Sequence, residues 1–318
     1  MKKYLYFFLL MPVLVLGQTP KDSITKLFNK KMYIEAERTA MHYLKANPQD
    51  MEIKELLGDA YGYQKKWDEA ISIYKQLVNY KRNSAEYQYK YGGAMGMKAL
   101  AVSKIEALGM VSDIRDAFLK AAELDPKHTN VRWALVEFYM QLPGIIGGSK
   151  AKALKYADEL YNLSKVDGYL AKGYIYEYDN NAQLAEKYYK LAIKEGGSLW
   201  CYEKLTTFYE KQKQPEKALS NLEEAKNKHK RNGLHYQIGK VAAENNIELQ
   251  KGEQYLQTYI ENYSSNDEVP KAWAYYRLAQ IYLHKKDKRE ALKHIDLAIS
   301  EDPKTKSFTE QKQKILRM

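Results

Sequence analysis

Residues 273–303, WAYYRLAQIYLHKKDKREALKHIDLAISEDP, carry the pattern that decides the fold. Apolar residues recur at the spacing of one helical face in each half of this stretch: Tyr275, Leu278, Ala279 and Tyr282, then Ala291, Ile295 and Ala298. A polar break at residues 285–289 separates the two halves, and Pro303 ends the second one. The stretch therefore predicts two helices packed against each other and joined by a short turn.

The spacing resembles that of the tetratricopeptide repeat, W-x2-L-G-x2-Y followed by A-x3-F and a closing Pro. Tyr275 stands at the Trp place of this template, Ala279 at the Gly place and Ile295 at the Phe place. The resemblance implies a helical hairpin that stacks on further copies of itself. Since such a repeat is a scaffold, its function has to be argued from its exposed surfaces.

Similar hairpin patterns fill nearly all of the chain. In the clearest N-terminal copy, Gly58 lies on the first helix and Tyr74 on the second. An insertion at residues 99–111 predicts an extended first helix in the third copy, and residues 306–316 predict a polar helix that caps the array. We therefore predict an all-α fold, a continuous α–α superhelix of about eight helical hairpins with a C-terminal capping helix, as one array over residues 18–318.

The first 17 residues have the three parts of a secretory signal peptide. Two lysines open the chain, residues 4–16 form an apolar run, and the small residues Val15 and Gly17 precede Gln18. The run is shorter than the roughly 20 residues that span a bilayer as a helix. We expect a periplasmic or secreted protein with no stable membrane span after cleavage, and an uncleaved anchor is the competing interpretation.

Charge and cysteine content restrict the class of protein further. The chain has 51 Lys and Arg against 40 Asp and Glu, a net charge of +11, which loss of the two N-terminal lysines lowers to +9. The basic residues are scattered over turns and helix faces, so we expect them to serve solubility, and we predict no nucleic-acid partner. Cys201 is the only cysteine, and its neighbours Trp200 and Tyr202 favour a buried apolar role for it.

Sequence motifs of catalysis are missing. None of the six histidines belongs to an H-E-x-x-H motif, and there is no G-x-S-x-G motif. Gly148-Ser149-Lys150 has the wrong order for a phosphate-binding loop and follows no predicted strand. We therefore predict a protein that is not an enzyme, with no catalytic residues, no cofactor and no metal site.

The turn at Pro143–Gly148 has an unusual composition, because it holds two isoleucines between glycines. In one interpretation Ile145 and Ile146 fold back onto the hairpin, and the glycines supply positive-φ positions. In the other, the turn contacts a partner or binds an anion at the helix start, where Ser149 caps and Lys150 adds charge.

In the tetratricopeptide family, ligands usually lie along the concave face made by the first helices of the hairpins. The resemblance places these residues at groove positions: Glu52, Glu55, Asp59, Tyr89, Trp133, Glu137, Tyr174, Tyr178, Trp200, Glu203, Tyr236, Trp273 and Tyr276. The family's carboxylate clamp needs Lys, Asn and Arg at such places, so acids and aromatics here disfavour binding of chaperone tails. The aromatics could equally well pack between neighbouring helices.

These observations favour a non-catalytic adaptor of the cell envelope that binds another protein or a peptide with basic and apolar residues. Two further hypotheses stay open: a membrane-associated component of an envelope assembly machine, and a carbohydrate-binding accessory protein that uses the aromatic groove. Aromatic side chains would anchor the partner, since they dominate the energetics of many interfaces.

We predict cleavage between Gly17 and Gln18, because a short apolar run followed by small residues is what signal peptidases recognise. Intact mass and N-terminal sequencing of the exported protein measure the new N-terminus. Retention of residues 1–17 in the mature chain would contradict the prediction and favour the anchor.

Overall fold

The computed structural model describes residues 19–318, so the predicted signal peptide and its cleavage site at Gly17 and Gln18 lie outside the described residues. Within that range the chain forms helices and no strand. The helices are α1 (Pro20–Asn29), α2 (Tyr33–Ala46), α3 (Met51–Tyr63), α4 (Trp67–Tyr80), α5 (Ala85–Ala101), α6 (Lys104–Leu124), α7 (Thr129–Gln141), η1 (Gly144–Ile146), α8 (Lys150–Leu163), α9 (Lys165–Tyr178), α10 (Ala182–Glu195), α11 (Leu199–Lys211), α12 (Pro215–His229), α13 (Asn232–Asn245), α14 (Leu249–Glu261), α15 (Lys271–His284), α16 (Lys288–Glu301) and α17 (Lys306–Leu316).

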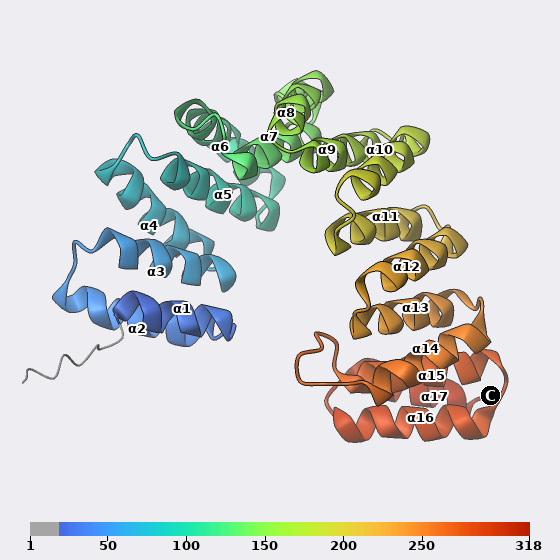
Figure 1. The fold of residues 1–318 in the computed structure, drawn as a ribbon. Helices are drawn as coiled ribbons and strands as arrows, with labels where there is room; N and C mark the ends of the chain where they lie inside the picture. Colours follow the sequence, from blue (N-terminus) through green and yellow to red (C-terminus); the bar gives the residue numbers. More distant parts are fainter. Residues whose placement is uncertain (1–18) are drawn as a thin grey trace, which may run out of the picture. The chain divides into compact units, whose positions relative to one another are not determined.

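The helices group into two compact units, one ending at Gln141 and the other beginning at Leu142. In the first unit α1 to α7 pack in chain order, each helix against the next. In the second unit α8 to α17 do the same (Figure 1). The prediction of an all-α fold made of successive helical pairs is confirmed. The extent of a single array over residues 18–318 stays a prediction.

The regular hairpins share one turn between their two helices. After α3, Lys65 takes a left-handed conformation with φ of 60°, and the Lys66 amide donates to the carbonyl of Tyr61 at 2.9 Å. Left-handed residues occupy the same place after α1, α9, α11 and α15, at Lys31, Asn180, Lys213 and Lys286. This is the Schellman arrangement, which satisfies carbonyls at a helix end and reverses the chain within a few residues.

Glycines on the first helices let rings of the second helices approach closely. A Cβ atom on Gly58 would lie 2.7 Å from Cε1 of Tyr74, and one on Gly173 would lie 2.6 Å from the ring of Tyr189. Both rings are almost fully buried. In each of these hairpins the tyrosine ring of the second helix fills the space that a side chain would take at the glycine of the first helix. This is why the repeat template has Gly at that place.

The third hairpin differs from its prediction. The insertion at residues 99–111 does not extend one first helix, because α5 ends at Ala101 and α6 begins at Lys104. Ser103 caps α6 by accepting a hydrogen bond from the Glu106 amide at 3.3 Å, which is the spacing of an N-terminal capping signal. Most of the insertion therefore lengthens the second helix, and the cap at Ser103 was not predicted.

The turn at Pro143–Gly148 does not fold Ile145 back onto the hairpin, since its side chain is 95% exposed. Gly147 has a φ of 106°, so the expectation of a positive-φ glycine is confirmed there. A Cβ atom on Gly148 would lie 1.8 Å from the carbonyl oxygen of Leu142, which leaves no room for a side chain. The turn is tightly built, and binding of a partner or an anion there stays a prediction.

The last helix, α17, spans the predicted residues and closes the second unit. Phe308 and Ile315 are fully buried on its inner face, in one core cluster with Ala279 and Ile295. Its outer face carries the exposed Lys306, Gln313 and Lys314. This division of apolar and polar faces suits a terminal helix, because the end of a stack of hairpins has to meet solvent.

Carboxylates join one hairpin to the next, as Glu186 on α10 illustrates. It accepts hydrogen bonds from Lys190 at 2.7 Å, from Lys217 at 2.9 Å and from the Tyr209 hydroxyl at 3.0 Å. Burial opposes ionisation of this carboxyl, but these three donors outweigh it and lower the pKa of Glu186 to about 2. The charged carboxylate thereby ties α10 to α11 and α12.

We expect Gly58→Leu to lower the free energy of unfolding by about 1–3 kcal/mol, because the new side chain overpacks against Tyr74. Hydrogen exchange should show the loss of protection first in residues 51–80, since each hairpin contacts mainly its neighbours. Gly109→Leu is the matched control, because no atom lies within 4 Å of a Cβ at Gly109. Unchanged protection in residues 51–80 would contradict the packing assigned to this glycine.

We expect Glu186→Gln to lower the free energy of unfolding at neutral pH by about 1–3 kcal/mol, because an ionised acceptor with three donors is lost. The folded-state pKa is about 2 against an ordinary value of 4.5, so the stabilisation is complete above about pH 4.5 and is lost as the pH falls toward 2. Urea titrations of both proteins across this pH range measure the difference.

Glu203→Gln provides the control for this measurement, since Glu203 is exposed and forms no ion pair with any residue from 19 onward. It removes the same charge and should change the free energy of unfolding by less than about 0.5 kcal/mol. If both variants lose the same free energy of unfolding, Glu186 acts only through the net charge of the protein, and its contacts with Lys190, Lys217 and Tyr209 add no stability.

Candidate functional site

A groove with a volume of 760 Å³ lies on the first unit. Side chains of the first helices α1, α3 and α5 line most of it, and α4 contributes its first residue and one ring. The lining residues are Thr25, Phe28, Leu56, Asp59, Gly62, Tyr63, Trp67, Tyr74, Tyr89, Lys90 and Met97. The groove therefore lies on the helices where the family resemblance places ligands, and it spans three consecutive hairpins.

One part of the groove is aromatic. The rings of Phe28 and Tyr63 lie 5.6 Å apart, and Tyr63 stacks on Tyr33 with 4.5 Å between centroids and 3° between planes. Tyr63 is 62% exposed. A ring that is held by a stacking partner while it stays exposed offers contact area without losing much conformational freedom on binding.

Repeat geometry brings these side chains together. Phe28 and Tyr63 stand near the C-terminal ends of α1 and α3, and Met97 stands in the last turns of α5. Successive first helices stack side by side at an interval of about 34 residues, so residues at corresponding places form a row across the hairpins. The groove thus has an apolar strip along one end of its first helices.

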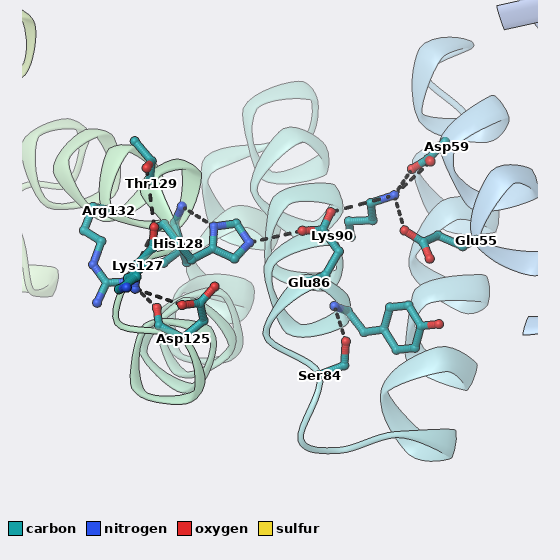
Figure 2. A network of polar contacts seen from close by, with 12 residues as sticks. Glu55, Asp59, Ser84, Glu86, Lys90, Asp125, Lys127, His128, Thr129 and Arg132 are labelled. Carbon is teal, nitrogen blue, oxygen red and sulfur yellow. Dashed lines mark hydrogen bonds and ion pairs between the residues drawn. The ribbon is translucent and has the colours of Figure 1, made fainter. Parts of the chain in front are cut away.

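Another part of the groove is polar and centres on Lys90 (Figure 2). Its ammonium group lies 2.6 Å from Glu55 Oε1 and 2.8 Å from Asp59 Oδ2, both on the neighbouring helix α3. Glu86, one turn earlier on α5, lies 3.9 Å away. Three carboxylates therefore surround one ammonium group, which leaves this cluster with two negative charges.

Burial and charge act in opposite directions on the pKa of Lys90. Burial alone would lower it, but the carboxylates of Asp59 and Glu55 outweigh burial and raise the pKa above its usual value. The Tyr74 hydroxyl donates to Asp59 Oδ1 at 2.6 Å, and burial together with this carboxylate raises the pKa of Tyr74. At neutral pH, Lys90 therefore stays charged and Tyr74 stays neutral.

The polar cluster continues toward α7 through His128. The Val131 amide donates to Nδ1 of His128 at 3.3 Å, so Nδ1 is an acceptor and Nε2 carries the proton. Nε2 then donates to Glu86 Oε2 at 3.1 Å, as Figure 2 shows. The imidazole ring also lies 5.0 Å from the ring of Tyr89, which lines the groove.

Arg132 fixes the turn that presents His128. Its buried guanidinium donates to the carbonyl oxygens of Asp125 at 2.7 Å and Ala122 at 3.1 Å (Figure 2 shows the first). These carbonyls belong to the C-terminal end of α6, where no helical partner remains for them. The arginine thereby joins the end of α6 to the start of α7.

Six of the sequence-predicted groove residues have clear places in the first unit. Glu55 and Asp59 meet at Lys90, and Tyr89 lines the groove beside them. On α7, Trp133 is half-buried and Glu137 is exposed, and neither lines the groove. Glu52 is exposed and pairs with Lys21 at 2.9 Å.

The other predicted residues lie in the second unit and occupy unlike surroundings. Tyr174 and Tyr178 contact each other on α9, and Tyr178 is half-exposed. On α11, Trp200 is 51% exposed with the ammonium of Lys204 over its ring at 4.1 Å, and Glu203 is exposed nearby in sequence.

Three of the predicted groove aromatics pack inside the second unit. Tyr236 is buried against Tyr259, so its side chain belongs to the core and offers no exposed surface. The rings of Trp273 and Tyr276 lie 4.9 and 5.3 Å from that of Phe308, on the capping helix. These three aromatics therefore pack between neighbouring helices, which was the alternative to a place in the groove.

Sequence reasoning missed Phe28, Tyr63, Trp67, Lys90 and Met97, which all line the groove. A signal for the strip was present, because Phe28, Tyr63 and Met97 follow one another at nearly the repeat interval. Lys90 carried a weaker signal, a basic residue four positions after Glu86 on a predicted helix. Its pairing with the preceding hairpin had no sequence signature.

Neither a metal-binding cluster nor a helix suited to span a membrane is present among residues 19–318. No group of three or more His, Cys, Asp or Glu side chains from residue 19 onward could hold a metal ion. No helix in the same range has both the length and the hydropathy of a membrane span.

Two segments of the chain match models of a known repeat family. A family model described as "Tetratricopeptide repeat" matches residues 272–305, and a second with the same description matches residues 56–84. The first of these covers the stretch of sequence that led to the resemblance. No curated protein matches the chain.

Two of the solved structures similar to this one are described as tetratricopeptide repeat proteins. One from Parabacteroides merdae has 14% identity and a TM-score of 0.49, and the match covers 93% of this chain and 97% of that one. A protein from Thermus thermophilus has 16% identity and a TM-score of 0.50 over 60% of this chain and 96% of its own. At this identity the likeness to the second structure shows the fold alone. The chain therefore contains tetratricopeptide repeats at residues 56–84 and 272–305, and the helices around them fold into successive hairpins.

Proposed function

We propose that this protein is an exported, non-catalytic adaptor, and that the groove on its first unit binds a peptide segment of another protein. The observation that carries the proposal is the groove itself, whose 760 Å³ volume combines exposed aromatic surface with a cluster of net negative charge. The tetratricopeptide fold is consistent with a protein-binding scaffold and is typically non-catalytic. The sequence pattern of residues 1–17 supports export.

The apolar strip defines one requirement for the peptide. Phe28, Tyr63 and Met97 offer a surface on which a large apolar side chain of the peptide can be buried. Burial of such a side chain contributes roughly 1.5–3 kcal/mol. Because the Tyr63 ring already stacks on Tyr33, little further ordering is needed when the peptide arrives.

The cluster around Lys90 defines the second requirement. Lys90 compensates only one of the three carboxylates Glu55, Asp59 and Glu86, so a Lys or Arg side chain of the peptide would find a favourable potential there. Lys90 also lowers the gain, because a second cation near it is repelled. We therefore expect the basic residue of the peptide to set orientation and association rate more than affinity.

We expect Tyr63→Ala to weaken binding of a labelled peptide that holds Phe and Lys residues by about 30-fold, or about 2 kcal/mol, because Tyr63 is the most exposed ring of the strip. Fluorescence anisotropy measures the dissociation constant. Peptides with Gln in place of Lys, or Ser in place of Phe, test each requirement separately. The Lys-to-Gln peptide should lose mainly association rate, and the Ser peptide should lose affinity.

Tyr80→Ala is the matched control, since Tyr80 is 66% exposed on α4 and does not line the groove. It should bind the peptide like the parent protein. Equal binding by Tyr63→Ala and the parent would remove the groove as the site, and the turn at Pro143–Gly148 would then be the better candidate. If none of the peptides binds but an oligosaccharide does, and Tyr63→Ala loses that binding, the carbohydrate-binding function would be favoured.

A further inference from the structure

A second groove, with a volume of 630 Å³, lies on the second unit. Its walls come from the second helices α10 and α12, and its floor comes from the first helix α11 between them. The lining residues are Lys190, Ile193, Lys194, Tyr202, Leu205, Tyr209, Lys217, Ser220, Asn221, Glu224 and Lys228. The first groove is lined mostly by first helices, so the two grooves use opposite members of the hairpins.

Lysines dominate the charge of this second groove. Four of them line it, Lys190 and Lys194 on α10 and Lys217 and Lys228 on α12. The nearby carboxylates are Glu224, in the groove, and Glu186, which pairs with Lys190 and Lys217. Four ammonium groups against two carboxylates leave two positive charges.

These charges are divided between fixed and available groups. Glu186 holds the ammonium groups of Lys190 and Lys217 at 2.7 and 2.9 Å. Lys194 and Lys228 form no ion pair with any residue in the described range 19–318. An anionic ligand would therefore meet two cations that it need not detach from carboxylates of the protein.

A buried polar contact joins α12 to α11 at this groove. Asn221 is 6% exposed and donates to the Tyr202 carbonyl at 2.9 Å and to the Thr206 hydroxyl at 2.8 Å. Thr206 occupies the place that Gly58 and Gly173 take in their hairpins. The sixth hairpin thus buries a hydrogen-bonded amide, which fixes α12 against α11 by directional contacts.

We propose that this groove binds an acidic segment of a protein, with carboxylates placed at Lys194 and Lys228 and an apolar side chain against the half-buried Ile193. Charge complementarity selects an anionic ligand, and the apolar lining selects one that also has apolar side chains. The proposal is independent of the groove on the first unit. It assigns the protein two surfaces of opposite charge for two different partner segments.

Nucleic acid fits the same groove less well. Tyr202 and Tyr209 are 2% and 3% exposed, so their rings give no open face on which bases could stack. The Tyr202 hydroxyl is engaged by Glu224 at 2.7 Å. The groove holds lysines and no arginine, so the bidentate fork that often recognises phosphate is missing from its lining.

The experiment uses the full mature chain and three labelled probes: a short peptide of alternating Glu and Leu, the same peptide with Gln in place of Glu, and a single-stranded oligonucleotide. Fluorescence anisotropy gives a dissociation constant for each. The Glu peptide should bind at least tenfold more tightly than the Gln peptide, and its binding should weaken as salt is added.

Variants assign the binding to the groove. Lys194→Glu and Lys228→Glu combined should weaken binding of the Glu peptide by at least tenfold. Lys314→Glu on α17 is the matched control, since Lys314 is exposed, unpaired among the described residues and outside the groove. It should bind within about twofold of the parent. Lys194→Glu alone, an exposed position, tests the site if the double variant does not fold.

Each other outcome overturns the proposal. An equal loss in Lys314→Glu would mean that the peptide responds only to the net charge of the protein. Undiminished binding by the groove variants would place the acidic segment elsewhere. An oligonucleotide that binds more tightly than the peptide, and loses binding in the same groove variants, would assign the lysines to nucleic acid.

Discussion

The close approach of two helices at a small residue is the contact on which each regular hairpin depends. The second-helix ring of Tyr74 or Tyr189 enters the space that Gly58 or Gly173 leaves on the first helix. Once the ring is in place, the distance and the rotation of the two helices are largely fixed, because a packed interior tolerates little displacement. The outward faces of the first helices then stand at predictable places, and the groove on the first unit follows from their stacking.

Tyrosine connects this packing to the polar surface. Tyr74 and Tyr189 bury their rings in the hairpin, while their hydroxyls donate to Asp59 at 2.6 Å and Glu177 at 2.7 Å. The same residue type therefore supplies core volume and fixes a carboxylate at the surface. In the first groove, the carboxylate fixed in this way is also a partner of Lys90. Core and candidate site are thus linked through one side chain.

The sequence predicted the architecture well because the repeat is decided locally. Apolar spacing, turns and the capping helix at residues 306–316 depend on neighbours within one hairpin, and the structure confirms them. The exception was also local: the cap at Ser103 divides the long insertion after α5. The side-chain position of Ile145 was harder to predict. Its exposure follows from the conformation of the turn at Pro143–Gly148, which the sequence pattern left open.

The candidate sites were harder to predict, because their charge depends on contacts between hairpins. Glu55 and Asp59 were expected at groove positions that suit a basic partner, yet Lys90, more than 30 residues later, compensates part of their charge. Trp273 and Tyr276 satisfy the groove pattern, but the capping helix places Phe308 against them. The basic groove was not predicted at all, since its lysines come from two hairpins and only the fold brings them together.

The ion pairs between hairpins have a consequence for how the chain folds. Lys90 and Glu55 are 35 residues apart in sequence, Lys217 and Glu186 are 31, and Lys285 and Glu253 are 32. The helices of each unit likewise pack mainly on their neighbours in the chain. The relative contact order is therefore low for a chain of this length. Because closing a loop costs entropy that grows with its length, each hairpin has to close only one repeat before it gains its neighbour's contacts. Such a chain can build its units progressively from any hairpin that forms first, without waiting for its two ends to meet.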